Sequence, residues 1–200
     1  VGNYSKEILK INPKAIIYAF EPHPETYDLL KKNIVADNFI TLNFGVGDRR
    51  EELMLYDYEN EPGSEHASLY KSVIEDLRKS PSKANKVQII KLDDFLTEQK
   101  IEYVDLLKID TEGNEYKVLL GAKDYLLNNR IEAIQFEFNE MNVISRTFFK
   151  DFWDLLPNYN FYRLLPGGGF IHIKEYRPVE CEIFAFQNII ATLKDSKKKF

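Results

Sequence analysis

Residues 104–121, VDLLKIDTEGNEYKVLLG, constrain the fold more than any other stretch of the chain. They begin with an apolar run that is too short to span a membrane and dense enough for a strand buried on both faces. The run stops at Asp110, and apolar residues resume after Asn114 at a spacing close to that of a helix. Strand, acidic turn and helix make half of a βαβ unit, whose ligands bind beyond the carboxyl ends of the strands. The acidic turn therefore either faces a binding crevice or caps the helix that follows.

Strand-like and helix-like segments alternate along the rest of the chain. The patterns predict strands at 15–20, 39–44, 51–58, 87–92, 131–138, 160–165 and 182–186, and helices at 2–11, 24–34, 93–98 and 148–156. Alternating strands and helices followed by closely spaced strands are typical of an α/β fold. We expect a mainly parallel sheet with an antiparallel strand pair near the C-terminus.

The composition favours one domain. The chain has 200 residues, 44% hydrophobic and 14% aromatic, which suffice for one substantial core. We expect a single α/β domain over residues 1–190. Within it, the mostly polar segment 59–85 is interrupted by Pro, Gly and Ser, which indicates an inserted loop or lid. Residues 191–200 are expected to form a basic C-terminal tail.

Charge and cysteine usage exclude several classes of protein. The net charge of −5 gives no electrostatic reason to bind nucleic acid. A single cysteine, Cys181, cannot form an internal disulfide, and three histidines do not make a zinc cluster. This cysteine usage fits a reducing, cytoplasmic location. No membrane-spanning run or signal peptide is visible, so we expect no membrane partner. The first residue is Val1, so we expect that the natural N-terminus is missing.

A glycine turn and a distant carboxylate have the spacing of a nucleotide site. In dinucleotide-type sites an acidic residue about 20 positions after the glycine turn binds ribose hydroxyls. Glu21 follows Gly2 by 19 positions and ends a predicted strand. Gly45, Val46, Gly47 and Asp48 are expected to form a flexible turn after the strand predicted at 39–44. The Asp48 carboxylate either accepts a hydrogen bond from an exocyclic amine such as that of adenine, or the segment is simply a tight turn into the next strand.

Five segments together resemble the FkbM family of S-adenosylmethionine-dependent methyltransferases. They are VGNYS at 1–5, AFEPHP at 19–24, GVGD at 45–48, KLDDFL at 91–96 and LLKIDTEGNEYKVLLGA at 106–122. The resemblance covers residues 1–138, and KIDTEGNE is its most specific piece. It implies a Rossmann-like class I methyltransferase sheet with a reversed last strand, whose first strand would lie upstream of Val1.

The same resemblance implies which residues bind S-adenosylmethionine. Gly2 matches the last glycine of the first motif, Glu21 the acid that binds the ribose, and Asp48 the polar residue near adenine. Asp110 matches the acid beside the sulfonium. The full set of implied cofactor-binding residues is Gly2, Asn3, Glu21, Pro22, Gly47, Asp48 and Asp110.

Methyl transfer to a hydroxyl needs a base that takes the hydroxyl proton. The candidate catalytic residues are Asp110, Glu112 and Glu137, with His66 less favoured. Many relatives resemble DVEGHE at 110–115, and Asn114 stands where they have histidine, so a base is not carried over from that position.

Two further features have weaker signals. Ser68, in HASL, resembles a short motif of the family and is a candidate for the acceptor pocket. Asp110, Glu137 and Asn139 end neighbouring predicted strands, so oxygen ligands for Mg²⁺ are conceivable there. Acidic strand ends also arise from capping and cofactor binding, so we do not favour Mg²⁺ and assign no metal ligands.

The predicted function is S-adenosylmethionine-dependent O-methylation of a hydroxyl on a sugar, a glycan or a small secondary metabolite. Acceptor choice would depend on residues 59–85 and 139–180, where the resemblance is weakest. The alternatives are a non-catalytic or fragmentary Rossmann-like binding domain and, less favoured, a nicotinamide-dependent oxidoreductase. The oligomeric state stays open.

Overall fold

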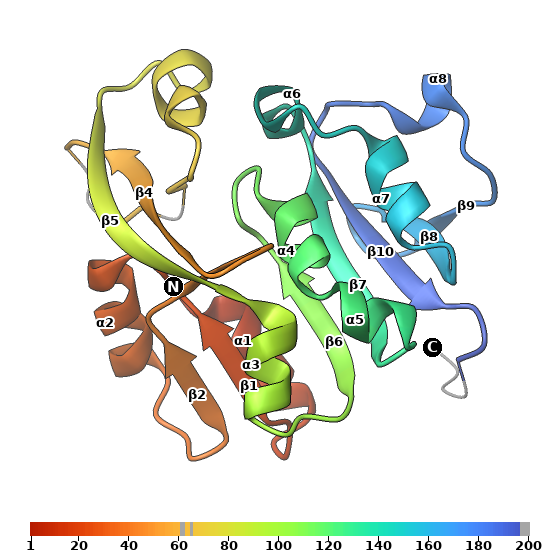
Figure 1. The fold of residues 1–200 in the computed structure, drawn as a ribbon, viewed down its shortest axis with the longest axis horizontal. Coiled ribbons are helices and arrows are strands. Elements are labelled where there is room, and N and C mark those ends of the chain that lie inside the picture. Colours follow the sequence, from red (N-terminus) through yellow and green to blue (C-terminus); the bar gives the residue numbers. More distant parts are fainter. Residues whose placement is uncertain (61–62, 65, 197–200) are drawn as a thin grey trace. The chain divides into compact units, whose positions relative to one another are not determined.

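A computed structural model describes residues 1–60, 63, 64 and 66–196. The chain divides into two compact units, Val1–Ile90 and Lys91–Phe200, which are described in turn (Figure 1). Whether they make the single domain expected over residues 1–190 stays a prediction.

The first unit begins with two helices and a pair of parallel strands. In chain order these are α1 (Asn3–Ile11), β1 (Ile17–Phe20), α2 (Pro24–Asn33) and β2 (Phe39–Leu42). Ile17 of β1 lies opposite Phe39 of β2. Helix α2 has Pro24 in its first turn and lysines in its last turn, as its sequence predicts. Leu30, Ile34 and Phe39 form the core between these elements.

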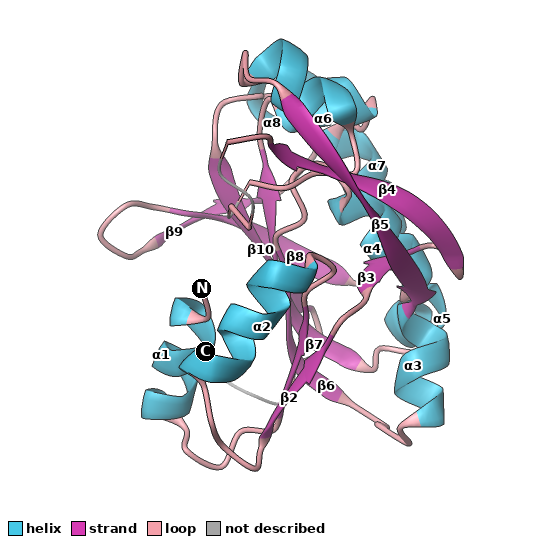
Figure 2. Ribbon diagram, turned by 90° about the vertical axis from the view of Figure 1, so that its left-hand side faces the viewer, coloured by secondary structure: helices cyan, strands magenta, loops and turns pink. Residues whose placement is uncertain are grey.

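The second part of this unit is a three-stranded sheet. It contains β3 (Gly45–Gly47), β4 (Glu51–Tyr58) and β5 (Ser82–Lys91) in the order β3-β5-β4. Strands β4 and β5 form the long antiparallel ribbon that both ribbon views show (Figures 1 and 2). A short π-helix, η1 (Val73–Leu77), lies between them in sequence. The strand predicted at 87–92 thus begins earlier, inside the expected insert, because residues 82–86 pair with β4.

The second unit surrounds a five-stranded sheet. Its elements are α3 (Leu92–Glu98), β6 (Val104–Ile109), α4 (Glu115–Gly121), α5 (Lys123–Leu127), β7 (Ile131–Phe138), α6 (Met141–Ser145), α7 (Phe149–Leu155), β8 (Tyr159–Leu164), β9 (Phe170–Ile173), α8 (Pro178–Cys181) and β10 (Gln187–Leu193). The strand order is β6-β7-β10-β8-β9. The predicted strand and helix at either side of Asp110 are confirmed as β6 and α4.

Strand pairing is more antiparallel than the sequence suggests. Strands β1 and β2 pair in parallel, as do β6 and β7. Strand β10 runs antiparallel to both β7 and β8, and β8 is antiparallel to β9. A short connection from β8 to β9 allows only antiparallel neighbours, whereas parallel strands need a long crossover. The α/β class is therefore confirmed, with mixed pairing and an antiparallel region larger than one pair.

The C-terminal boundaries were predicted wrongly. Residues 182–186 form no strand; instead, the Glu182 carboxylate accepts the N–H groups of Phe149 (2.8 Å) and Lys150 (3.0 Å) at the start of α7. The strand is β10, where Ile189 and Ala191 are fully buried. The basic tail therefore cannot begin at residue 191, because β10 continues to Leu193. Its last four residues, 197–200, lie outside the described part of the chain.

Aromatic side chains form much of the core of the second unit. Phe136, Phe138, Phe149, Phe152 and Phe161 are almost completely buried. The rings of Phe136 and Phe152 stack with centroids 4.6 Å apart. Phe149, Phe152 and Leu156 of the helix predicted at 148–156 are therefore core, whereas Phe148 at its start is 55% exposed. Among the described residues, no helix is long and apolar enough to cross a membrane.

Candidate functional site

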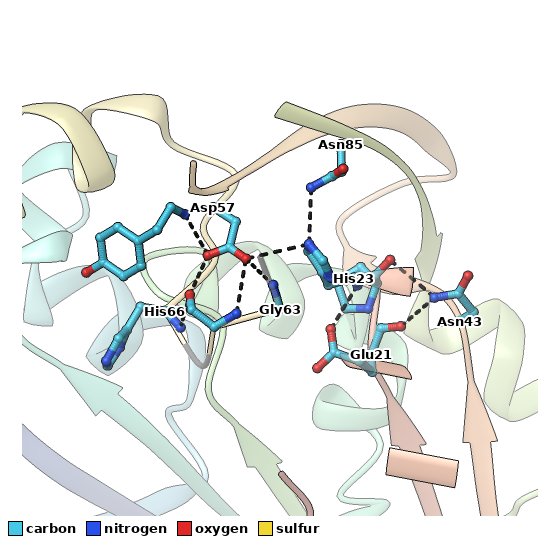
Figure 3. Close-up of polar contacts among 10 residues, drawn as sticks. Glu21, His23, Asn43, Asp57, Gly63, His66 and Asn85 are labelled. Carbon is cyan, nitrogen blue, oxygen red and sulfur yellow. Dashed lines mark hydrogen bonds and ion pairs between the residues drawn. The ribbon is translucent and has the colours of Figure 1, made fainter. Parts of the chain in front are cut away.

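Glu21 lies directly after β1, at the carboxyl end of the parallel pair in the first unit. Its backbone N–H donates to Leu42 O (2.9 Å), and its Oε1 accepts the N–H of His23 (2.8 Å; Figure 3). The pKa of the Glu21 carboxyl is raised to about 7, mainly by burial. The hydrogen bond from the His23 N–H lowers this pKa, and the negative charge of Asp57 raises it further. Its Oε2 has no hydrogen-bond partner within the described part of the chain. This oxygen can accept a hydroxyl group of a ligand.

Asn43 fixes the turn that carries Glu21 and Pro22. Its Nδ2 donates to Glu21 O (2.9 Å) and to Pro22 O (3.2 Å), as Figure 3 shows. A Cβ at Gly45 would lie 3.5 Å from Pro22 Cβ and only 2.5 Å from Ile89 Cδ1. The turn after β1 and the glycine strand β3 therefore pack closely, as a site built from both requires.

Gly2 precedes α1 in the left-handed conformation, with φ +82°. This backbone favours glycine, and a Cβ there would meet the side-chain ends of Leu30 (Cδ1, 2.9 Å) and Ile34 (Cδ1, 3.0 Å), which would have to shift. Asn3 is exposed as the first residue of α1. Gly2 thus closes the start of α1 against α2.

Gly47 and Asp48 lie at the end of β3. Gly47 is buried and Asp48 is partly exposed directly after the strand. The flexible turn expected over residues 45–48 is therefore wrong for its first three residues, which form β3 because they pair with β5; the connection to β4 covers residues 48–50. The role of Asp48 near adenine stays a prediction.

In the second unit, the acidic turn follows β6. Asp110 is half-exposed, and its Oδ2 lies 3.1 Å from Lys108 Nζ. Glu112 is buried and adopts a left-handed backbone with φ +52°, which costs free energy in a residue other than glycine. Neither Asp110 nor Thr111 caps α4, because the N-cap residue is Asn114. The capping interpretation of this turn is therefore wrong.

Glu115 holds the acidic turn together. This buried carboxylate accepts Thr111 N–H (2.9 Å), Thr111 Oγ1–H (3.0 Å) and Gly113 N–H (3.1 Å to Oε2). Burial raises the pKa of the Glu115 carboxyl, and these hydrogen bonds partly offset the rise. The sequence pattern indicated the turn and missed this residue as its support. The signal was a glutamate four positions after Thr111, at the start of a helix.

Glu137 is the second carboxyl group with a strongly raised pKa. The pKa of Glu137 is raised to about 7, mainly by burial. The negative charge of Asp110 makes the next largest contribution, and Glu112 and Glu115 make smaller ones. Lys108 opposes the shift. The structure thus brings together the three predicted catalytic residues Asp110, Glu112 and Glu137. A carboxyl group that titrates near neutral pH can take a proton from a hydroxyl.

The two weaker candidates lie in the first unit. Ser68 is fully buried, its backbone pairs with Tyr56, and its Oγ accepts Tyr70 N–H at 3.1 Å. These contacts support the backbone and give Ser68 a structural role. His66 is exposed and packs edge-on to Tyr58. No group of three or more His, Cys, Asp or Glu that could hold a metal ion occurs within the described residues.

Sequence reasoning missed the surroundings of Glu21. The side chains of His23 and Asp57 are almost completely buried and lie 3.5 Å apart. The signal was the histidine between two prolines, directly after Glu21. Asp57 gave none, because its burial depends on contacts distant in sequence.

Comparisons with known proteins agree on one class of enzyme. A family model described as "Methyltransferase FkbM domain" matches residues 2–163. "Methyltransferase sdnD" of Sordaria araneosa is 29% identical over 149 residues, which cover 62% of this chain and 58% of that protein. "2-O-methyltransferase NoeI" of Sinorhizobium fredii is 22% identical over 180 residues, covering 84% and 72%. "Methyltransferase 1" of Beauveria bassiana is 31% identical over 140 residues, covering 62% and 55%. The chain thus spans little more than half the length of two of these relatives.

A solved structure shows the same fold. The crystal structure of "Methyltransferase FkbM" from Methylobacillus flagellatus superposes with a TM-score of 0.51, over 95% of this chain and 40% of that one. The sequence identity is 10%, so the likeness concerns the fold alone. It confirms the expected Rossmann-like methyltransferase architecture.

Proposed function

Because the chain belongs to the FkbM methyltransferase family, we propose that it uses S-adenosylmethionine to methylate a hydroxyl group on a sugar, a glycan or a small secondary metabolite. The relatives reported above are methyltransferases, and one carries the name of a 2-O-methyltransferase, which supports an oxygen acceptor. A nicotinamide-dependent reaction gains no support from this family. Action on small molecules or glycans in the cytoplasm is part of the proposal.

The observation that carries the proposal is the Glu21 carboxylate at the end of β1. One of its oxygens is held by the His23 N–H, and Oε2 lacks a partner among the described residues. An ionised carboxylate in this position accepts hydrogen bonds from vicinal ribose hydroxyls. Gly2, Asn3, Pro22, Gly47, Asp48 and Asp110 complete the proposed cofactor-binding set.

The residues fit the cofactor. Gly2 has a left-handed backbone that favours glycine, and Pro22, in the turn with Glu21, packs on the glycine strand β3. When bound, S-adenosylmethionine would supply the methyl group of its sulfonium. The sulfur would leave as a neutral thioether, which needs no proton. The protein then has two tasks, to align the acceptor oxygen with the methyl group and to take the proton of the acceptor hydroxyl. Alignment of the reacting atoms accelerates the transfer.

Glu137 is the proposed base. A carboxyl with a pKa of about 7 is partly ionised at neutral pH and accepts a proton more readily than an ordinary glutamate. Burial keeps the Glu137 pKa high, and the negative charges of Asp110 and Glu112 add to this. Asn139 Nδ2 lies 3.5 Å from Glu137 Oε2 and limits its orientation. Asp110 is proposed to lie beside the sulfonium.

Calorimetric titration of the full-length protein with S-adenosylmethionine tests the proposal. We expect saturable binding, and transfer of radiolabelled methyl to a hydroxyl-bearing oligosaccharide or metabolite in a panel that includes amine acceptors. A folded protein that shows no binding heat would refute cofactor use. Binding without transfer to any hydroxyl in the panel would instead favour a non-catalytic binding domain.

A further inference from the structure

His23 is buried where the turn after β1 meets the β4–β5 ribbon. Its side chain is 2% exposed. Its Nε2 lies 3.1 Å from Asn85 Nδ2 on β5 and 3.5 Å from Asp57 Oδ2 on β4 (Figure 3). Two partners meet at this one nitrogen, so Nε2 can donate to Asp57 when protonated and accept from Asn85 when it is not.

Asp57 is itself fixed. Its side chain is 1% exposed and accepts the N–H groups of Tyr58 (2.7 Å), Gly63 (2.7 Å) and Ser64 (3.1 Å). The Ser64 hydroxyl also donates to its Oδ1. These donors hold the carboxylate independently of His23. Asp57 is therefore a firm anchor for the imidazole.

The backbone of the same histidine holds Glu21. The His23 N–H donates to Glu21 Oε1 at 2.8 Å, and His23 is the N-cap residue of α2, where its own side chain caps nothing. We propose that His23 is a positioning residue for cofactor binding: its imidazole is held at Nε2 by Asp57 or Asn85, as donor or acceptor respectively, and so keeps the His23 backbone N–H against the Glu21 carboxylate, which aims Glu21 at the ribose hydroxyls. This inference rests on the proposed use of S-adenosylmethionine.

The two ring nitrogens are not equivalent, which makes the inference testable. His23 Nδ1 is buried and has no partner among the described residues. All described polar contacts that hold the ring are therefore at Nε2. A glutamine amide reaches the position of Nε2, whereas an asparagine amide reaches only that of Nδ1. His23→Gln should keep the anchor and His23→Asn should lose it.

The first experiment measures S-adenosylmethionine binding by calorimetry. We expect His23→Asn to weaken binding about tenfold, the effect of losing one charge-assisted hydrogen bond, and His23→Gln to stay within about threefold of wild type. Because only cofactor affinity changes, the KM for S-adenosylmethionine should rise with little change in kcat. His172→Gln, at an exposed histidine on β9, is the matched control.

The second experiment needs no cofactor. In the ligand-free protein, the His23 N–H lowers the pKa of Glu21. An NMR titration of the Glu21 carboxyl should therefore give a higher pKa in His23→Asn than in wild type or His23→Gln. If His23→Asn does not fold, Asn85→Ala removes one of the two Nε2 contacts and should weaken cofactor binding about threefold.

The outcomes separate this inference from the proposed function. Equal affinities and equal Glu21 pKa values in folded wild type, His23→Asn and His23→Gln would overturn it, while wild-type binding would preserve the proposed function. Equal weakening by both His23 substitutions, or an unchanged affinity in Asn85→Ala, would also overturn the assignment to Nε2. Absence of binding by the wild type would refute the proposed function. The Glu21 pKa values would still show whether the His23 side chain supports the hydrogen bond from the His23 backbone N–H to Glu21.

Discussion

Glu21 and Glu137 both have a pKa raised to about 7, and they reach it in different surroundings. The pKa of Glu21 is raised by burial, lowered by the one backbone N–H that its carboxylate accepts, and raised further by the charge of one other carboxylate, Asp57. Glu137 is raised by burial and by the charges of three other carboxylates of its own unit. A carboxylate held by a backbone N–H suits hydrogen bonds to a ligand, and one clustered with three other carboxylates suits proton transfer. The same pKa thus goes with two different roles.

The largest expected effect concerns Glu137. Glu137→Gln keeps the shape of the side chain and removes the base, so kcat should fall by a factor of about 100 to 10,000. The affinity for S-adenosylmethionine, measured by calorimetry, should stay within about twofold. Glu140→Gln changes an exposed neighbour and is the control. Retention of wild-type kcat in Glu137→Gln would remove its role as base.

Glu21 should show the reverse pattern. Glu21→Gln loses charge-assisted hydrogen bonds to the ribose, so the Kd for S-adenosylmethionine should rise about tenfold to a hundredfold. Glu25→Gln, at an exposed position in the first turn of α2, is the control. An unchanged Kd in a folded Glu21→Gln protein would refute the ribose role.

The pH dependence of binding sharpens the comparison. Only ionised Glu21 can accept both ribose hydroxyls, and its pKa is raised from 4.5 to about 7. Calorimetry should therefore show affinity falling as pH drops below 7, by up to about tenfold per unit. Glu21→Gln should lose this dependence, and Glu137→Gln should keep it. If the pH dependence of affinity disappeared only in Glu137→Gln, Glu137 rather than Glu21 would be assigned to cofactor binding.

The same shift has a consequence for stability. The folded protein binds the Glu21 proton more tightly than the unfolded chain does, so this contribution to the free energy of unfolding is present below pH 4.5 and is lost as pH rises through about 7. In the ligand-free protein, denaturant titrations at several pH values should show a flatter profile for Glu21→Gln. An identical profile would mean that Glu21 titrates alike in both states.

The smallest expected effect is that of metal removal. If Glu137 serves as a base, EDTA should change the methyl-transfer rate by less than about twofold. If Asp110 and Glu137 instead bind Mg²⁺, EDTA should abolish activity and added Mg²⁺ should restore it. That second result would replace the proposed role of Glu137.

The sequence predicted the parts of each site that depend on local pattern. Strand β6, the acidic turn and α4 follow from the change in apolar spacing at Asp110, and Glu21 follows from its place after a short apolar strand. The proximity of Asp110 and Glu137 also follows, because they end adjacent strands.

Features that depend on distant contacts were missed. Residues 82–86 are polar and form a strand because β4 pairs with them. Strand β10 is specified by burial between β7 and β8, and the lysines after it suggested a tail instead. His23 and Asp57 meet across two sheets of the first unit, which no spacing in the sequence reports.

The most direct test of these two roles is single-turnover methyl transfer at saturating S-adenosylmethionine, compared between Glu21→Gln and Glu137→Gln. Saturation compensates for weak binding, so Glu21→Gln should approach the wild-type rate, whereas Glu137→Gln should remain at least about a hundredfold slower. The opposite order, with Glu137→Gln restored by saturation and Glu21→Gln still slow, would contradict the assignment of cofactor binding to Glu21 and proton transfer to Glu137.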